Sequence, residues 1–191
     1  MAQHRDSARE TILTAFQDLL VETRGSSASL DDVARRAGVT KGGLLYHFGS
    51  RRILEDALVD RLEVLSAADL EKMRTAPGGA AAFYLPLRDY VDSPLDRVTV
   101  AVGQLAHDND RARTAIAQLR AASYALLLAD LGDPLVARAA ILIADGLYYE
   151  TLTTGAIPDD EVDMIAFIER LKATGPPTGL TTGLPAGPPA G

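Results

Sequence analysis

The 191-residue chain contains no cysteine, which excludes disulfide bonds and thiol chemistry. No apolar run approaches the length that a membrane-spanning helix needs, and the polar N-terminus carries no secretory signal. From these absences we expect a cytoplasmic protein that does not enter a membrane.

Motifs that serve enzyme chemistry are missing as well. The sequence has no Gly-rich phosphate loop, no nucleophile elbow and no paired-histidine motif. Its three histidines, His4, His47 and His107, stand in unrelated contexts. Residues 107–110 look like the start of a calcium loop but lack its glycine and terminal glutamate, so we interpret them as a helix end followed by an N-cap. We therefore expect neither an enzyme nor a bound metal or cofactor.

Strand-forming patterns are also scarce. Runs of β-branched residues are few, Ala, Leu, Arg and Glu are frequent, and 47% of the residues are hydrophobic. This composition predicts an all-α fold with enough apolar side chains for a buried core. A chain of this length accommodates one or two modest domains.

Basic charge is in short supply too, because the net charge is −7 at pH 7. The deficit is uneven: residues 1–55 have a balance of +1, and the remainder has a balance of −8. Residues 40–52 contain Lys41, Arg51 and Arg52 and no acid. A basic edge on an acidic body suits a small DNA contact that weakens as the salt concentration rises.

What the sequence does contain is a helix-turn-helix pattern at residues 29–48. Ser29 is a good N-cap, and Asp32 three residues later completes a capping box. One face of the first helix is apolar and consists of Leu30, Val33, Ala34 and Ala37. Gly38 can adopt the left-handed conformation that ends this helix, and Val39 is expected to fill the gap between the two helices.

Thr40 is expected to cap the second helix, which runs from Lys41 to about His47. Its buried side should consist of Leu44, Leu45 and Phe48. Its outer side is left with Lys41, Gly42, Gly43, Tyr46 and His47. Adjacent glycines weaken a helix start, but they are useful where another backbone, here that of DNA, comes close. The alternative is that they only loosen the helix start.

A third helix is predicted to begin after Gly49, with Ser50 as its cap. Arg51 and Arg52 occupy its first turn, where the partial positive charge of a helix N-terminus disfavours positively charged side chains. The placement is favourable if a phosphate docks there, because backbone N–H groups and guanidinium groups then converge on one anion. The alternative is a solvated pair of arginines.

Taken as a set, this stretch resembles the DNA-binding domain of the TetR/AcrR family of bacterial transcriptional regulators. The matching residues are Val33, Ala34, Ala37, Gly38, Val39, Thr40, Lys41, Gly42, Leu44, Tyr46, His47, Phe48, Ser50 and Arg51. The sequence departs from the usual family pattern at Gly43, Leu45, Arg51 and Arg52.

The resemblance implies an all-helical homodimer with an N-terminal three-helix DNA-binding domain and a C-terminal domain that senses a ligand and dimerises. It implies that double-stranded DNA is contacted by Thr40, Lys41, Gly42, Gly43, Tyr46, His47 and Arg51. Such a protein is a one-component regulator, and we expect a repressor that a small-molecule effector releases from a pseudo-palindromic operator. The alternatives are an activator, or a helix-turn-helix protein that acts through protein contacts.

Further helices are predicted along the whole chain. A capping box at Ser7 and Glu10 should start the first helix, which runs up to Gly25. The other expected helices cover residues 50–74, 96–107, 110–131, 134–153 and 159–173, with a break at residues 77–79. We expect the DNA-binding domain in residues 1–52, a ligand-binding and dimerisation domain in 53–173, and a disordered Pro/Gly-rich tail in 174–191.

The helix predicted at residues 134–153 is apolar almost all round. One row consists of Ala137, Ala140, Ile141, Ala144, Leu147 and Tyr148, and another of Leu135, Ala139, Leu142, Gly146 and Tyr149. A helix that is apolar on two sides is buried on two sides, so one side should face a second copy of the chain. We predict a dimer interface at Ala137, Ala140, Ile141, Ala144 and Tyr148. The alternative is burial of both sides within the monomer.

A ligand site is expected among the helices from Phe83 to Thr153. Such a pocket needs an apolar lining with a few polar anchors, and the candidates are Gln104, Tyr124, Asp145 and Tyr149. The alternatives are core tyrosines and a partly exposed acid at position 145. Because the body is acidic, we expect a neutral or cationic, largely apolar effector.

Overall fold

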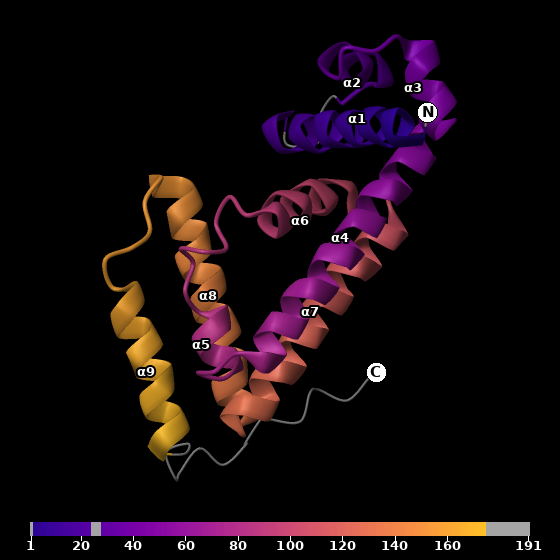
Figure 1. Ribbon diagram of the computed structural model, residues 1–191. Coiled ribbons are helices and arrows are strands. Elements are labelled where there is room, and N and C mark those ends of the chain that lie inside the picture. Colours follow the sequence, from indigo (N-terminus) through magenta and orange to yellow (C-terminus); the bar gives the residue numbers. More distant parts are fainter. Residues whose placement is uncertain (1, 24–27, 175–191) are drawn as a thin grey trace, which may run out of the picture.

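A computed structural model describes residues 2–23 and 28–174, and within these residues it contains helices and no strand (Figure 1). The helices are α1 (Ala2–Thr23), α2 (Leu30–Arg36), α3 (Lys41–Phe48), α4 (Arg51–Thr75), α5 (Ala80–Tyr84), α6 (Pro94–Leu105), α7 (Asp110–Leu131), α8 (Pro134–Thr154) and α9 (Glu161–Thr174). The all-α prediction is confirmed. Gly25 and the tail beyond residue 174 lie outside the described residues.

The short helices α2 and α3 lie on α1 at one end of the molecule (Figure 1). Ser29 caps α2 through its hydroxyl, which accepts a hydrogen bond from the Asp32 backbone N–H at 3.2 Å. Gly38 ends α2 with a φ of 67°, and Val39 packs against the shared core. The predicted helix-turn-helix is therefore present, with the predicted caps.

Two local predictions are wrong. The first helix does not start at the Ser7 capping box but at Ala2, and the Ser7 carbonyl accepts a hydrogen bond from Thr11 inside the helix. Residues 2–6 contain no glycine or proline that would stop the helix from extending backwards. Leu45 is not part of the core, because Leu44 and Phe48 already fill the buried side of α3.

The long helix α4 connects the two ends of the molecule. It has 25 residues, as predicted, and Ser50 caps it through a hydrogen bond from the Ile53 backbone N–H at 3.3 Å. A helix of this length spans about 37 Å. Over that distance α4 packs against both α6 and α7 (Figure 1). Helix α4 therefore belongs to both the N-terminal end and the body.

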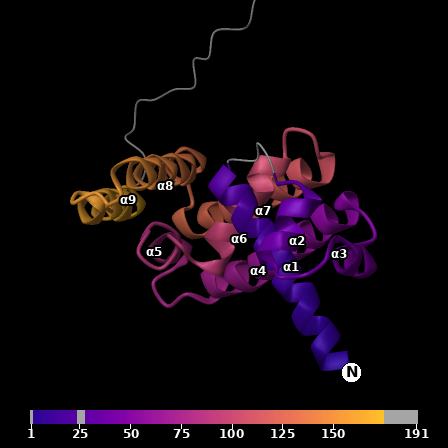
Figure 2. The same ribbon diagram turned by 90° about the horizontal axis from the view of Figure 1, so that it is seen from above.

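The body is built from α5–α9. Ser93, Asn109 and Asp133 cap α6, α7 and α8 through side-chain oxygens. The helix at α5 was not predicted. Figure 2 shows α8 and α9 on one side of the molecule, away from α2 and α3. Among the described residues, no helix is long and apolar enough to cross a membrane.

The apolar helix α8 has one buried face and one exposed face. Ala137, Ala140, Ile141 and Ala144 are buried within the same chain, where they pack with side chains such as Leu127. Our prediction that this row faces a second copy is therefore wrong, because α7 and α9 already cover it. The exposed row is the other one: Leu135, Leu142, Tyr149 and Leu152 are 54–70% exposed.

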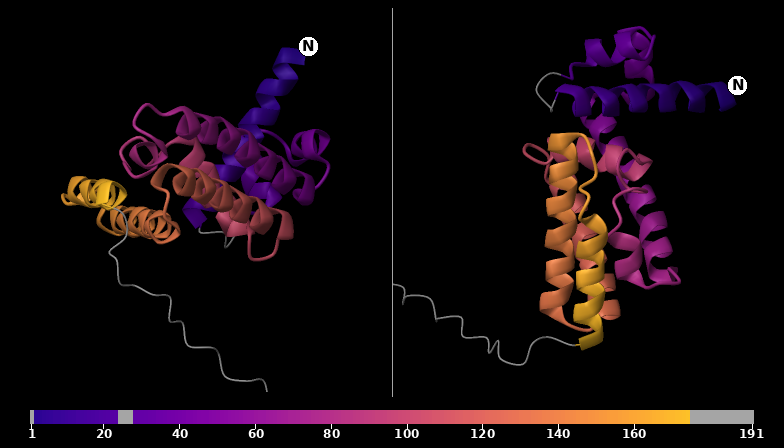
Figure 3. Two further views of the ribbon diagram at one scale, coloured as in Figure 1. Left: turned by 90° about the horizontal axis from the view of Figure 1, so that it is seen from below. Right: turned by 90° about the vertical axis from the view of Figure 1, so that its left-hand side faces the viewer.

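Helix α9 lies antiparallel beside α8 (Figure 3) and is held at both ends by polar contacts. At its start, the buried Glu161 carboxylate accepts a hydrogen bond from the Leu87 backbone N–H at 2.7 Å. At its end, the Lys172 ammonium donates to Asp130 of α7 at 2.6 Å, and Asp130 also accepts from the Ala81 backbone N–H at 2.9 Å. Helix α9 is thus anchored to the segment after α5 and to α7.

Candidate nucleic-acid interface

The outer side of α3 presents most of the predicted DNA-contacting residues on one surface. Thr40 caps the helix, and its hydroxyl accepts a hydrogen bond from the Gly43 backbone N–H at 3.1 Å. Lys41 and Gly42 are exposed in the first turn, and Tyr46 is 68% exposed one turn later. The structure therefore brings Thr40, Lys41, Gly42 and Tyr46 together.

The Lys41 ammonium lies 2.9 Å from the Asp31 carboxylate of α2. Both side chains are more than half exposed, and an exposed ion pair of this kind contributes about 0–1 kcal/mol. A phosphate can therefore replace Asp31 as the partner of Lys41 at little cost.

The glycines of α3 differ in the space around them. A methyl group on Gly42 would extend into nearly open space, with the Thr40 hydroxyl oxygen 4.0 Å away. On Gly43 the same group would lie 3.3 Å from that oxygen and 3.9 Å from the Val39 Cβ. The lack of a side chain at Gly43 therefore leaves room for the Thr40 hydroxyl to cap the helix. The bare backbone at Gly42 allows another surface to approach α3 closely.

Tyr46 and His47 form an edge-to-face ring pair with centroids 5.4 Å apart. Tyr46 projects outward and His47 is half-buried, so Tyr46 has the greater contact area to offer. The T-shaped contact limits the orientations that the tyrosine ring can take.

Arg51 is placed differently from the expectation that it meets DNA. Its Nη1 donates to the Ala28 carbonyl, its Nε donates to Glu55 at 2.8 Å, and its guanidinium carbon lies 5.6 Å from the Phe16 ring centroid. Arg52 is more open, with 62% of its side chain exposed and its Nε 3.5 Å from Asp56. Of the two arginines at the start of α4, Arg52 is the one directed outward.

The four candidate ligand residues are not brought together. Gln104 is exposed on α6, Tyr149 is exposed on α8, and Tyr124 of α7 is half-buried with its hydroxyl 3.5 Å from the Pro134 carbonyl. Asp145 forms an ion pair with Arg120 of α7, and both side chains are partly exposed. This arrangement matches the alternative of a partly exposed acid at position 145.

A different polar cluster lies between the body helices. The Tyr148 hydroxyl donates to the buried Asp96 carboxylate at 2.5 Å, and the Tyr90 ring contacts the Tyr148 ring edge-on at 5.8 Å. Burial raises the pKa of Tyr90 to about 12, and burial together with the Asp96 charge raises the pKa of Tyr148. The local sequence does not identify Asp96 as part of a buried cluster. An acid three residues after a cap such as Ser93 is an ordinary feature of the first turn of a helix.

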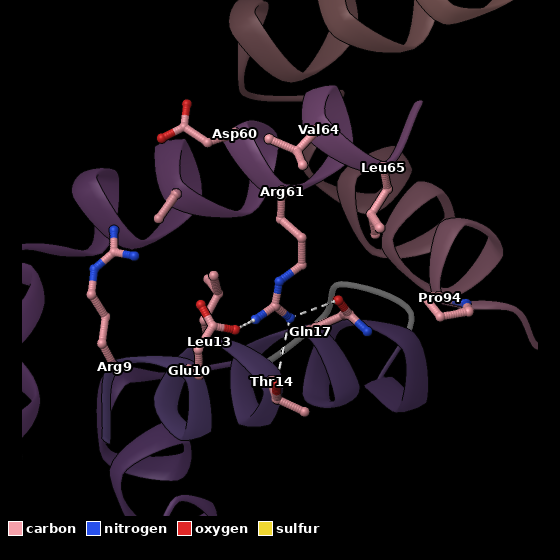
Figure 4. A pocket seen from close by; sticks show the side chains of 11 residues that line it. Arg9, Glu10, Leu13, Thr14, Gln17, Asp60, Arg61, Val64, Leu65 and Pro94 are labelled. Atoms are coloured by element: carbon pink, nitrogen blue, oxygen red, sulfur yellow. Dashed lines mark hydrogen bonds and ion pairs between the residues drawn. The ribbon is translucent and has the colours of Figure 1, made fainter. Parts of the chain in front are cut away.

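A cleft of about 500 Å³ separates α1 from α4 (Figure 4). Arg61 extends from α4 across this cleft and donates to Glu10 at 2.5 Å and to Gln17 at 3.1 Å, both on α1. Leu13, Val64 and Leu65 supply apolar lining. The cleft is lined by none of the four ligand candidates.

Comparison with known proteins agrees with this geometry. Residues 20–58 match the family model "Bacterial regulatory proteins, tetR family". The chain is 36% identical over 61 residues to the HTH-type transcriptional regulator SrpR of Pseudomonas putida, a match that covers 31% of this chain and 29% of SrpR.

Solved structures share the fold over most of the chain. The multidrug binding protein EbrR, in complex with imidazole, is 24% identical with a TM-score of 0.58, and the match covers 85% of this chain and 93% of EbrR. SCO7518 from Streptomyces coelicolor A3(2) is 22% identical with a TM-score of 0.61, covering 87% and 99%. The helix-turn-helix region therefore matches the tetR family model over residues 20–58, and the fold of the chain is similar to those of EbrR and SCO7518.

Proposed function

We propose that this protein is a one-component transcriptional regulator that binds an operator in double-stranded DNA and represses transcription. The observation that carries the proposal is the outer side of α3, where Lys41 and Tyr46 stand exposed beside the bare backbone of Gly42. Such a surface suits a recognition helix whose N-terminal turn contacts phosphates while its side chains reach the major groove.

The direct test measures DNA binding by the purified protein. Fragments flanking its own gene are compared with unrelated DNA of equal length in a filter-binding or gel-shift assay at several salt concentrations. We expect preferential binding to a flanking fragment, with an affinity that falls as salt rises. Equal, weak binding to every fragment would contradict a role as an operator-binding regulator.

We infer that the functional unit is a homodimer formed through the exposed faces of α8 and α9. The apolar side chains on this surface are Leu135, Leu142, Tyr149, Leu152, Val162 and Phe167. Exposed apolar side chains on two neighbouring helices are typical of an interface. Two recognition helices in a symmetric dimer would contact successive major grooves about 34 Å apart, on a pseudo-palindromic site.

We also propose that a neutral or cationic, largely apolar effector binds among α5–α8 and releases the protein from DNA. Tyr90, Asp96 and Tyr148 would supply its polar contacts there. EbrR, whose fold this chain shares, is a multidrug binding protein. To change DNA binding, an effector must bind more tightly to the conformation with low DNA affinity than to the one with high DNA affinity. A 5–150-fold change in operator affinity is typical.

A thermal-shift screen with neutral and cationic aromatic compounds tests the effector proposal. Compounds that raise the melting temperature are then added to the DNA-binding assay. We expect at least one of them to release DNA. Stabilising compounds that all leave the DNA affinity unchanged would contradict ligand control.

A further inference from the structure

A continuous series of polar contacts joins the body to the start of the helix-turn-helix. It begins at Asn109, the N-cap of α7, which is 2% exposed. The Asn109 Oδ1 accepts from the backbone N–H groups of Arg111 and Ala112 at 3.1 and 3.2 Å, and its Nδ2 donates to Glu55 of α4 at 3.1 Å. One side chain therefore caps α7 and also binds α4.

The series continues from Glu55 toward α2. The other oxygen of the Glu55 carboxylate accepts from the Arg51 Nε at 2.8 Å. The Arg51 Nη1 donates to the carbonyl of Ala28, the residue just before the Ser29 cap of α2. The three side chains thus link α7 to the backbone that precedes the DNA-contacting unit.

Neighbouring contacts limit the freedom of this link. Arg111, two residues after the cap, donates to the Asp56 carbonyl at 2.9 Å and to the Asp60 carboxylate at 2.5 Å, both on α4. Phe16 of α1 underlies the Arg51 guanidinium. Two neighbouring residues, Asn109 and Arg111, therefore hold the N-terminus of α7 against the first turns of α4.

We propose that Asn109 is a positioning residue, which acts through Glu55 and Arg51 to set the orientation of α2 and α3 relative to the body. A shift at the corner between α6 and α7 would pass through this contact series to the Ala28 backbone. The expected effect of Asn109 on DNA affinity rests on the proposed function. Its expected effect on the orientation of α2 does not.

The decisive variant is Asn109→Asp. Aspartate keeps the cap oxygen that α7 needs, but it removes the donor to Glu55 and places a second negative charge beside that carboxylate. We expect operator affinity to fall by about fivefold or more. We also expect faster hydrogen–deuterium exchange in residues 28–36, and a lower melting temperature because the new carboxylate is buried beside Glu55.

The double variant Asn109→Asp with Glu55→Gln reverses the direction of the hydrogen bond. The new amide at position 55 can donate to the new carboxylate at position 109 and still accept from Arg51. We expect this double variant to recover operator affinity and exchange protection to within about twofold, a coupling that independent sites would not show.

Asp133→Asn is the matched control, because Asp133 caps α8 through its side chain and, among residues 2–23 and 28–174, that side chain bonds only to the backbone of its own cap. We expect no change in either measurement. The inference is overturned if Asn109→Asp changes neither measurement, or if its losses follow thermal stability and the double variant does not recover them. If the unmodified protein binds no DNA, the proposed function fails, and the exchange of residues 28–36 still decides the role of Asn109.

Discussion

At the scale of single residues, backbone conformation and side-chain partners separate positions that look alike in the sequence. Gly38 has a φ of 67°, whereas Gly103 lies within α6, and a methyl group on either would meet no atom within 4 Å. Lys41 and Arg51 each stand at a helix start, yet Lys41 pairs with an exposed acid and Arg51 contacts the Ala28 backbone.

Gly38→Ala should destabilise the fold by about 1–2 kcal/mol, because a side chain in the left-handed region is strained. Gly103→Ala should stabilise it by about 0.5–1 kcal/mol, since alanine favours a helix interior. Denaturant unfolding of both variants measures the difference. Equal effects of the same sign would show that the conformation at Gly38 is not the cause.

Lys41→Ala should weaken binding to all DNA sequences and reduce the salt slope by about one unit, because one phosphate contact is lost. Arg51→Ala should weaken binding while leaving the salt slope unchanged, because its guanidinium already contacts the Ala28 carbonyl and the Glu55 carboxylate. Salt titrations of both variants separate the two roles. If Arg51→Ala lowered the salt slope, Arg51 would be shown to contact a phosphate.

At the scale of elements, α8 and α9 form a pair with one buried and one exposed apolar face. The buried face of α8 is rich in alanine, which lets α7 and α9 pack closely against it. The larger side chains Leu135, Leu142 and Tyr149 remain outside. Association with a second copy would bury them.

Leu142→Glu should weaken dimerisation by about tenfold or more, because an unpaired charge in an interface is costly. Val64→Glu is the matched control: Val64 is 69% exposed but lies on α4. Light scattering at micromolar concentration provides the measurement. A monomeric unmodified protein, or equal effects of the two variants, would contradict an interface on α8.

Ala140→Arg should instead disrupt folding, since Ala140 is fully buried.

The docking of α9 should depend on pH through the contact between Asp130 and Lys172. Burial opposes the Asp130 charge, but hydrogen bonds from Ala81 and Lys172 outweigh it and lower the pKa of that carboxyl. A lowered folded pKa means that the stabilisation is present above the ordinary aspartate range and is lost as pH falls through the lower value.

Asp130→Asn should therefore lower stability by about 1–3 kcal/mol at neutral pH and by less in acid. The pKa of Lys172 is raised, chiefly by its hydrogen bond to Asp130, so the same contact is lost only when pH rises through that higher value. Unfolding measured from pH 3 to 7 tests this, with Asp108→Asn on the surface as the control. A loss that is the same at every pH would contradict the assignment.

At the scale of the whole molecule, packing runs across the expected boundary after residue 52. The core around Phe16 continues through Leu58 of α4 and Val98 and Val102 of α6 into α7. A second core joins the far end of α4 to α5, α7, α8 and α9. The N-terminal helices therefore share their core with the body.

A fragment of residues 1–55 should consequently show little cooperative folding, because it lacks the side chains of α4 and α6 that complete its core. Circular dichroism during thermal unfolding measures this. A sharp transition in the fragment, similar to that of the full chain, would show that the first three helices are self-sufficient. The boundary after residue 52 would then be a true domain boundary.

The local sequence determined the helix-turn-helix and most helix ends, because caps, glycines and prolines act within a few residues. Tertiary structure decided which face of α8 is buried, since both of its faces are apolar and only the placement of α7 and α9 distinguishes them. It also decided the role of Arg51, whose partners Ala28 and Phe16 lie far away in the sequence. Periodicity shows that a face is apolar, whereas its partner depends on how distant segments pack.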